Sequence, residues 1–405
     1  MAAKPISDEH CQEIVDLYML HGSEPKTAQA LNISRSTFHT QLREAHRRGF
    51  KARTESPNSE RNLKEKIRRL ELELKSATRE SSELDSIKGV IGALRNKVED
   101  LDTPDFLINP RKQHGSPGVP TLFLSDLHWA EIVHPSQING VNHYNLRIAH
   151  ERMQTCADSA VHLLKILSPK MDYPGLVMPL GGDMISGNIH EELTASNEIN
   201  SMPAVLDLYG VLRGVINQMA DTFGHVFLPC VTGNHGRDTH KIWAKDRHHT
   251  SFDWLLYRFL AKSFEADKRI TFYIPDGPDA YYKIYDHAYL LTHGDSFKTG
   301  DSMIGCLGPI LRGDHKKRSR NAQIDMQYDT MILGHFHSYI HHGRVIVNGS
   351  LKGYDEFAYA GNFGFERPQQ ALWITHPKYK ITYRMPVYVD REREPIKTAW
   401  VSMPR

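Results

Sequence analysis

The chain has 405 residues, a length typical of two or three domains. The chain has 50 Lys and Arg and 48 Asp and Glu, so its net charge does not indicate a polyanionic partner. Any site for nucleic acid must therefore be a local cluster of basic residues. The longest apolar runs are far shorter than the roughly 18 residues that span a bilayer, and mean hydropathy is −0.49. The first ten residues, MAAKPISDEH, contain charges and no apolar signal core, and four widely spaced cysteines exclude a disulfide scaffold. We therefore expect a cytoplasmic protein.

Three short helices are predicted at the N-terminus. Ser7 is suited to cap the first helix, which Gly22 follows. A second helix is expected over about 24–31, and a third begins after the cap Ser34 and extends to about Arg48. The side chains expected in the core of this segment are Ala28, Leu31, Ile33, Phe38 and Leu42.

This pattern resembles the helix-turn-helix of bacterial and phage DNA-binding domains. Between Lys26 and Arg53 there are seven Lys or Arg and one acid, Glu44. The exposed side of the third helix would contact bases and phosphates. Its expected DNA contacts are Arg35, Ser36, His39, Thr40 and Arg43. The alternative is a protein-docking module of three helices with a solvated basic face.

A coiled coil is predicted next, because apolar residues recur every seven positions. They are Leu63, Leu70, Ala77, Leu84, Ile91 and Val98. Self-association through this helix, as a dimer or a larger homo-oligomer, is the expected role; a helix packed on the next domain, or a helical hairpin, is the alternative. The predicted domain boundaries are a helix-turn-helix domain at 1–53, a coiled coil at 60–101, a linker at 102–118 and a catalytic domain at 119–405.

The remainder alternates strands and helices, which predicts an α/β domain. The expected strands cover 119–124, 176–180, 226–231, 289–292, 331–333, 345–347, 371–374 and 379–389. The expected helices cover 145–167, 203–223 and 251–264.

Five of these strands run directly into residues that can bind a metal. The sequences that follow them are Asp126-Leu127-His128, Gly182-Asp183, Gly233-Asn234-His235, His293-Gly294 and Gly334-His335-Phe336-His337. Each motif alone is weak evidence, since a His or Gly-Asp after a strand is commonly structural. In open α/β sheets, functional sites lie at the carboxyl ends of the strands. Five such motifs in succession therefore indicate that their side chains form one site.

The ordered set resembles the calcineurin-like metallophosphoesterase superfamily over residues 119–350, including Asn348-Gly349-Ser350. The resemblance implies a four-layer α/β/β/α sandwich that holds two divalent metals. It places one metal on Asp126, His128 and His337 and the other on Asn234, His293 and His335, with Asp183 bridging them. Manganese is the first expectation, with iron, zinc or similar ions as alternatives. His235 would be catalytic, protonating the leaving oxygen or stabilising its charge.

Two departures from the family pattern affect the chemistry. Gly236 stands where the family often has an acid that orients the histidine, and Asp238 is a candidate substitute. The sequence after Asp183 lacks the Asp-Arg-Gly of the protein-phosphatase branch, which favours the phosphodiesterase and nuclease branches.

A nucleic-acid substrate is favoured by two further segments. Residues 312–320 (RGDHKKRSR) are predicted to form a flexible basic loop beside the site, with Arg312, Lys316, Lys317, Arg318 and Arg320 as DNA contacts; an ordinary solvated loop is the alternative. Residues 243–254 mix basic, histidine and aromatic side chains that could hold phosphates or stack bases, although Phe252, Trp254 and Leu255 could equally be core.

The combined prediction is a metal-dependent phosphodiesterase that acts on DNA as an exo- or endonuclease, similar to phage or bacterial repair nucleases. Its partners would be DNA, further copies of the chain and, by resemblance, an ATPase subunit; no membrane is involved. If it is phage-encoded, the bacterial host cytoplasm is its location. The alternatives are a phosphatase or phosphodiesterase for small nucleotides, and a DNA-binding assembly protein with a vestigial metal site.

Overall fold

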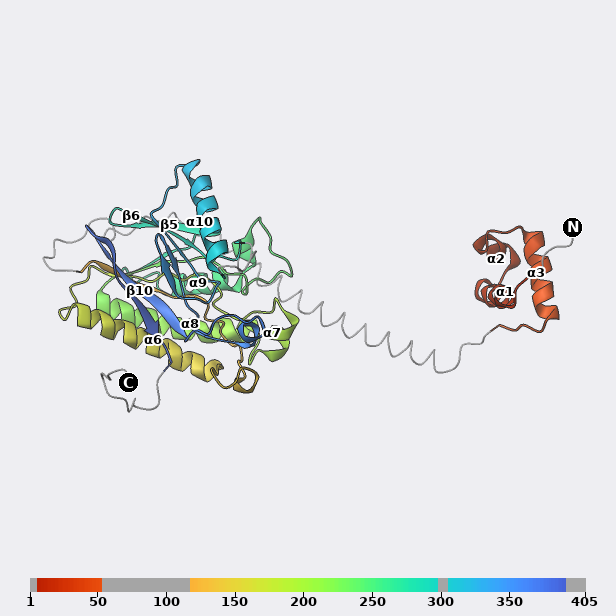
Figure 1. Cartoon of the computed structure of the whole chain (residues 1–405), viewed down its shortest axis with the longest axis horizontal. Helices are drawn as coiled ribbons and strands as arrows, with labels where there is room; N and C mark the ends of the chain where they lie inside the picture. Colours follow the sequence, from red (N-terminus) through yellow and green to blue (C-terminus); the bar gives the residue numbers. More distant parts are fainter. Residues whose placement is uncertain (1–5, 53–116, 298–304, 391–405) are drawn as a thin grey trace, which may run out of the picture. The chain divides into compact units, whose positions relative to one another are not determined.

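The computed structural model describes residues 6–52, 117–297 and 305–390 (Figure 1). Residues 6–52 belong to one compact unit and residues 117–390 to another. The predicted coiled coil at 60–101 and nearly all of the predicted linker lie outside the described residues. Within the described ranges, every helix is too short or too polar to cross a bilayer.

The N-terminal unit consists of three helices, α1 (Asp8–His21), α2 (Glu24–Ala30) and α3 (Arg35–Arg47). The boundaries agree with those expected from the capping residues. Ser7 Oγ accepts from the N–H of His10 at 3.2 Å, and Ser34 Oγ accepts from the N–H of Thr37 at 3.1 Å. Gly22 ends α1 with a left-handed φ of +61°. Phe38, Leu42 and Ala28 are buried in the core of the unit as predicted, while Leu31 and Ile33 are partly buried against it.

The second unit contains two mixed sheets. The first has the order β11-β10-β1-β2-β3-β4 and the second β5-β6-β7-β9-β8. Strands β1 to β4 are parallel, as are β6, β7 and β9, and the remaining pairings are antiparallel. The strands are β1 (Val119–Phe123), β2 (Leu176–Val177), β3 (Val226–Pro229), β4 (Ile270–Tyr273), β5 (Asp279–Ile284), β6 (His287–Thr292), β7 (Thr330–Leu333), β8 (Ile340–His342), β9 (Val345–Val347), β10 (Gln369–His376) and β11 (Lys380–Tyr388).

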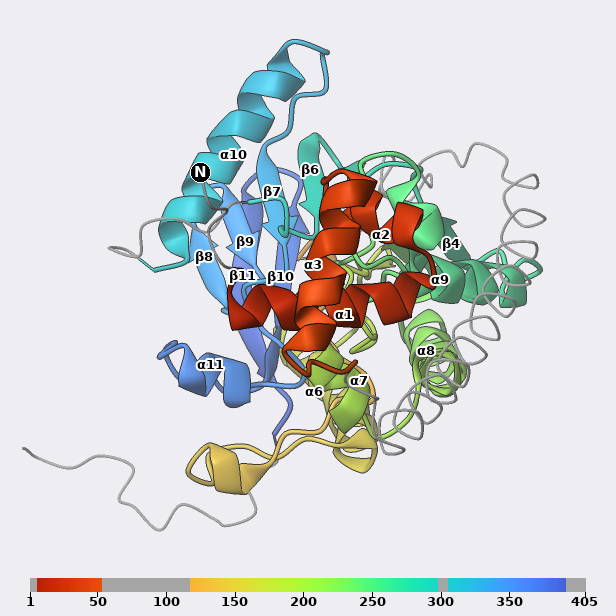
Figure 2. The same ribbon diagram turned by 90° about the vertical axis from the view of Figure 1, so that its right-hand side faces the viewer.

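The helices of this unit lie between and after the strands. The long ones are α6 (Leu146–Leu167), α8 (Ser201–Phe223), α9 (Phe252–Ser263) and α10 (Leu307–Ala322). Shorter helical segments are η1 (Pro135–Gln137), α7 (Glu191–Ser196), η2 (Arg247–Thr250) and α11 (Glu356–Ala360). Figures 1 and 2 show α6, α8 and α9 on one side of the sheets and α10 on the other.

Alternation along the strands divides the core into three layers. In β1, Leu122 packs with α6, α8 and α9, whereas Phe123 points into the space between the two sheets. In β7, Ile332 faces that same inner space, whereas Leu333 packs toward Ile310 of α10. Helices, sheet, sheet and helix are therefore stacked in that order, which confirms the predicted four-layer α/β/β/α sandwich.

The predicted central strands are present, but the structure adds β4, β5 and β8, which the sequence pattern missed. All three are edge strands of their sheets. Polar side chains interrupt the apolar pattern of β5 (DAYYKI) and β8 (IHH), whereas β4 (ITFY) is apolar but only four residues long.

The predicted loop at 312–320 is wrong: these residues belong to α10. Helical structure is favoured there because one face is apolar or small and packs on the second sheet, with Gly308, Ile310 and Gly313 buried. The basic side chains share the helix with that face. Lys317 Nζ lies 2.6 Å from Asp279 Oδ1 of β5, and both side chains are at most 9% exposed. Arg320 Nη2 contacts the same carboxylate at 2.8 Å.

Loss of Asp279 tests how α10 is attached. The Asp279→Ala variant leaves the buried Lys317 ammonium uncompensated, and we expect its free energy of unfolding at pH 7 to fall by about 3–5 kcal/mol in urea denaturation. Arg320→Ala is the control: its side chain is half exposed, so we expect a loss below about 1 kcal/mol. Equal losses in the two variants would contradict the buried pair as the main attachment.

The same pair should respond to acid. Burial alone would raise the pKa of Asp279, but Lys317 and Arg320 outweigh it and hold the pKa below its ordinary value. The contribution of the pair is therefore present above the ordinary aspartate pKa of about 4 and is lost as pH falls through the lowered pKa. The stability difference between wild type and Asp279→Ala should accordingly shrink on acidification.

Candidate metal centre

Loops from both sheets meet at the carboxyl ends of the parallel strands. The loop after β1 is joined to the loop after β2, since Asp126 N–H donates to the Gly182 carbonyl at 3.0 Å. The loop after β7 is joined to the loop after β6, since Gly334 N–H donates to His293 O at 3.1 Å. The N–H of His335 donates to Asp126 Oδ1 at 2.8 Å, which links the two sheets directly.

Most of the predicted metal-binding residues have a left-handed backbone. The φ angles are +53° at Asp126, +46° at His128, +52° at Asp183, +68° at His335 and +50° at His337. This conformation costs a non-glycine residue roughly 1–2 kcal/mol. Five such residues at one site, none a glycine, indicate that their side chains are required there for a reason other than folding.

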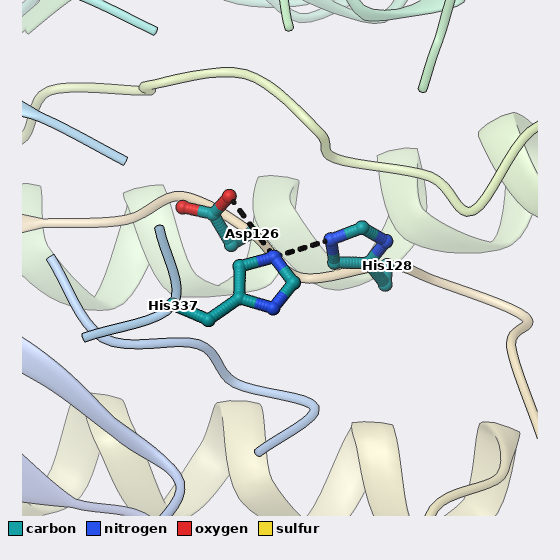
Figure 3. Close-up of side chains that lie close together, drawn as sticks. All are labelled: Asp126, His128 and His337. Atoms are coloured by element: carbon teal, nitrogen blue, oxygen red, sulfur yellow. Dashed lines mark hydrogen bonds and ion pairs between the residues drawn. The ribbon is translucent and has the colours of Figure 1, made fainter. Parts of the chain in front are cut away.

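The first group of side chains is Asp126, His128 and His337 (Figure 3). Asp126 and His128 come from the loop after β1 and His337 from the loop after β7. His337 Nε2 lies 3.5 Å from Asp126 Oδ1 and 3.0 Å from His128 Nε2. Asp126 and His128 are fully buried, whereas 30% of the His337 side chain is exposed. The group is thus open on the side of His337.

The second group is Asp183, His293 and His335, and Asn234 lies against it. His293 Nε2 lies 3.0 Å from Asp183 Oδ2 and 3.2 Å from Asn234 Oδ1. Asp183 also belongs to a mixed group with His128 and His235. Asp183 therefore lies next to both groups; its role as a carboxylate that bridges two metals, which the family resemblance implies, stays a prediction. All seven predicted metal-binding side chains are brought together.

A buried chain of charges orients His128. Its Nδ1 lies 3.3 Å from Glu131 Oε2, and Glu131 Oε1 accepts from Lys352 Nζ at 2.8 Å. Lys352 Nζ donates in turn to Asp355 Oδ2 at 2.5 Å. A carboxylate on one ring nitrogen directs the lone pair of the other toward a metal. Neither Glu131 nor Lys352 was predicted from the sequence, although the i, i+3 spacing of Glu131 from His128 is visible there.

Asp253, at the start of α9, supports the second group and was also missed. Its Oδ2 accepts from the N–H of Asp183 at 3.0 Å and from Gly233 at 2.9 Å, and its Oδ1 accepts from Met184 at 3.1 Å. Burial raises its pKa to about 6, with the Asp183 charge acting in the same direction. A Cβ on Gly236 would lie 2.7 Å from Asp253 Oδ1. The departure from the family pattern at Gly236 therefore makes room for this carboxylate.

The strand-turn after β9 supports the Asp126 loop. Asn348 Nδ2 donates to Ser125 Oγ at 2.9 Å, and Ser350 Oγ donates to the Asp126 carbonyl at 2.9 Å. Ser125 Oγ donates to Asp126 Oδ2 at 2.5 Å. These bonds restrain the Asp126 carboxylate and the backbone of its loop.

The electrostatics of the site depend on its histidines. Burial would lower the pKa of His293, but Asp183 and Asp126 outweigh it and raise the pKa to about 10. Burial lowers the pKa of His335 and His128 to about 4, helped by His293 and by Lys352 respectively. For Asp126 and Asp183, burial alone would raise the pKa; the neighbouring histidines instead lower it.

The donor set fits two divalent cations. Each group offers carboxylate oxygen and imidazole nitrogen, a mixture that suits manganese, iron or zinc. His293 Nδ1 lies 2.8 Å from the Gly181 carbonyl, so its Nε2 is left to face Asp183 and Asn234. In the first group the Glu131 carboxylate lies 3.3 Å from His128 Nδ1, so each group has one histidine with a buried oxygen beside its Nδ1.

His235 lies beside both groups. Its ring is 4.5 Å from that of His128 between centroids, and its Nδ1 lies 2.9 Å from the Ser186 carbonyl. The carbonyl thus fills the orienting role that the sequence suggested for Asp238. Burial lowers the pKa of His235, against the charges of Asp183 and Glu131. His190 is a further imidazole nearby, 5.9 Å from His235 between centroids.

The predicted DNA contacts on α3 are all exposed: Arg35, Ser36, His39, Thr40 and Arg43. Glu24 of α2 reaches this face, with its carboxylate 3.1 Å from His39 Nδ1 and 3.7 Å from Arg35 Nε. The face is therefore basic with one acid at its edge.

The predicted basic contacts at 312–320 are not equivalent. Arg312, Lys316, Lys317 and Arg320 border a hollow of about 300 Å³ with Phe297, whereas Arg318 pairs with Asp314 at 2.8 Å. Lys317 is committed to Asp279. In the 243–254 region, Trp254 and Leu255 are buried core, and Trp243 is 54% exposed. His248 and His249 form a separate small group with Asp276.

Comparisons with known proteins give few matches. No protein-family model and no curated protein sequence matches the chain. Among solved structures, a conserved uncharacterized protein of Streptococcus pneumoniae, described as a predicted phosphoesterase, shares 11% identity with a TM-score of 0.24 over 63% of this chain and 81% of its own. A Vps29 mutant from Entamoeba histolytica shares 11% identity with a TM-score of 0.26 over 66% of this chain and 98% of its own. The sulfate thiohydrolase SoxB of Thermus thermophilus shares 9% identity with a TM-score of 0.29 over 69% of this chain and 58% of its own.

The support given by Asp253 is testable through metal affinity. Asp253→Asn places an amide N–H₂ against backbone donors, so the loops that carry Asp183 and Asn234 lose part of their anchorage. We expect manganese affinity, measured by calorimetry, to fall by about 10–100-fold. Asp286→Asn, at an exposed turn, is the matched control and should bind manganese like the wild type. Wild-type affinity in a folded Asp253→Asn protein would contradict the role.

Proposed function

We propose that the protein is a dinuclear-metal-dependent phosphodiesterase that hydrolyses DNA. One observation carries the proposal: the group Asp126, His128 and His337 adjoins the group Asp183, His293 and His335, because Asp183 also lies within metal-binding distance of His128. Asp126, His128 and His337 would hold one ion, Asn234, His293 and His335 the other, and Asp183 both. A pair of divalent ions would supply Lewis acidity toward the phosphoryl oxygens and lower the pKa of water.

The residues of the chain have separate tasks in this reaction. Asp126 and Asp183 would provide the negative charge that balances the cations. The backbone N–H groups of His335 and His235 hold these two carboxylates in place. Glu131 and the Gly181 carbonyl hold the rings of His128 and His293 in their binding tautomers. The 30% exposed side of His337 leaves an approach for the phosphodiester.

His235 is proposed to protonate the leaving oxygen when it is itself the imidazolium, or otherwise to stabilise the charge on that oxygen. With Nδ1 directed at Ser186 O, its Nε2 is the nitrogen available to a substrate. Arg237 lies close by, where its Nη1 donates to the Asn234 carbonyl at 2.7 Å. It thus stiffens the segment that carries both Asn234 and His235.

DNA is the proposed substrate because the N-terminal unit presents a basic helix face of the kind that binds it. An exo- or endonuclease would use this unit, and self-association through residues 60–101, to retain DNA near the metal centre. An ATPase subunit is a further proposed partner. Manganese is the proposed metal.

The proposal is tested with end-labelled single- and double-stranded DNA. We expect cleavage with manganese and none with EDTA. Asp183→Ala should lower turnover at least about a hundredfold, the scale on which loss of one transition-state contact acts. Cleavage of a small nucleotide but not DNA would instead indicate a nucleotide phosphodiesterase, and full activity of Asp183→Ala would overturn the shared carboxylate.

The role of the α3 face is tested by salt dependence. Replacing Arg35 and Arg43 by Ala removes two expected phosphate contacts. We expect the slope of log affinity against log salt to become shallower by about two, and DNA affinity to fall. Arg147 is an exposed arginine on α6, so Arg147→Ala is the control and should keep the wild-type slope and affinity. An unchanged slope in the double variant would remove the N-terminal unit from DNA binding.

A further inference from the structure

An unusual surface lies just after the strand-turn that supports Asp126. Residues 354–365 contain five aromatic side chains, and most of them face solvent. The exposed fractions are 77% at Phe357, 43% at Tyr359, 56% at Phe363 and 55% at Phe365. We call residues 354–365 the aromatic segment. Figure 2 shows its helix, α11, at the periphery of the second unit, away from the sheets.

The rings are arranged in pairs and do not enter the core. Phe357 and Phe363 lie 5.8 Å apart between centroids, and Tyr354 and Phe365 lie 5.5 Å apart. None of these residues belongs to the hydrophobic core clusters of the described chain. Four large exposed aromatic residues in a single short segment are unfavourable in water, so they indicate a surface that binds something.

One end of the segment is attached to the first metal group. Asp355 Oδ1 caps α11 by accepting from the N–H of Ala358 at 2.7 Å, while its Oδ2 pairs with buried Lys352. Lys352 binds Glu131, and Glu131 faces His128. The position of the helix and the orientation of His128 therefore depend on the same ion chain.

The other end is attached to the loop of His337. Glu366 Oε1 accepts from the N–H of Tyr339 at 2.5 Å, two residues after His337. The segment is also fixed in its middle, where Asn139 Nδ2 donates to the Tyr359 hydroxyl at 2.8 Å. Hydrogen bonds thus fix the segment at both ends, and both ends are joined to loops that carry residues of the first group.

We propose that the aromatic segment is a stacking platform for unpaired bases of the DNA whose phosphodiester lies at the metal centre. This rests on the proposed function and specifies its substrate as single-stranded DNA or an unpaired end. Every base has a π-face that stacks on aromatic rings, and a base is available for this only outside a duplex. Occupation by another protein, including a second copy of this chain, is the competing outcome.

Unpaired bases are favoured over a protein partner because of how the segment is placed. Its ends are joined to the loops that carry His128 and His337, so a DNA chain with its phosphate at those residues would extend toward the segment. A docking surface for a protein would not need this connection to the ligand loops.

The experiment uses the full-length chain and oligonucleotides labelled at one end. We expect Phe357→Ala and Phe363→Ala each to raise KM for single-stranded DNA about tenfold, which corresponds to the lower range of a base–aromatic stack. Their effect on a small chromogenic phosphodiester should be much smaller than that. Tyr379→Ala, a 65% exposed aromatic at the turn between β10 and β11, is the matched control and should cleave DNA like the wild type.

Two further substrates and variants separate stacking from apolar docking. Phe363→Leu keeps an apolar side chain but removes the ring, so it should behave like Phe363→Ala; Phe363→Trp should retain wild-type KM. On an oligonucleotide with abasic sites beside the scissile phosphate, wild type and Phe363→Ala should have equal KM values, because no base is left to stack on the ring. Persistence of the difference on abasic DNA, or wild-type KM in Phe363→Leu, would overturn the stacking platform.

The outcomes also distinguish this inference from the proposed function. If wild type hydrolyses neither DNA nor the chromogenic phosphodiester with manganese, the proposed function fails. If it hydrolyses both and the Phe357 and Phe363 variants match wild type on single-stranded DNA, the platform alone fails. Loss of a dimer in Phe357→Ala, measured by analytical ultracentrifugation without a change in KM, would assign the surface to self-association instead.

Discussion

Two buried carboxylates, Asp126 and Asp183, are the constraint on which the second unit depends. Each is at most 1% exposed, has a left-handed backbone, and accepts a backbone N–H from another loop, Asp126 from His335 and Asp183 from His235. The groups that lower their pKa values are histidines. Under the proposed function these imidazoles would also be metal ligands, and the cations would then supply the countercharge for the two carboxylates. The sandwich supplies the rigidity that keeps two such charges close together.

Support for these carboxylates comes from three separated parts of the chain. Asp253 on α9 fixes the loops of Asp183 and Gly233, Asn348 and Ser350 fix the loop of Asp126, and Glu131 with Lys352 fixes His128. Each support is itself buried and hydrogen-bonded, so removing one partner would leave a polar group unpaired in the core. The Lys352 chain continues to Asp355 and α11. Through it, the orientation of His128, a candidate metal ligand, and the position of α11 share one set of interactions.

The elements predicted correctly from the sequence are mostly those whose side chains are buried. Central strands were predictable because both of their faces are buried and apolar, and amphipathic helices because one stripe along each helix is apolar. The period of the apolar residues tells the two apart. Strands β4, β5 and β8 were missed because they are short or interrupted by polar side chains. The segment 312–320 was misassigned because its charges outnumber its apolar residues, while the small buried face at Gly308 and Gly313 that makes it a helix is visible only against the second sheet.

The amino-acid sequence by itself determined the helix boundaries of the N-terminal unit, the alternation of strands and helices in the second unit, and the identity of the side chains that meet at the strand ends. These depend on local capping, hydrophobic period and the rule that parallel strands present their carboxyl ends at one edge. Tertiary structure alone decided that Asp253 and Lys352 support the site, that the Ser186 carbonyl contacts His235, and that Lys352 and Tyr339 anchor the two ends of the aromatic segment. Apart from the pair of Lys352 and Asp355, those contacts join residues tens to hundreds of positions apart, and no local pattern encodes a partner at such a separation.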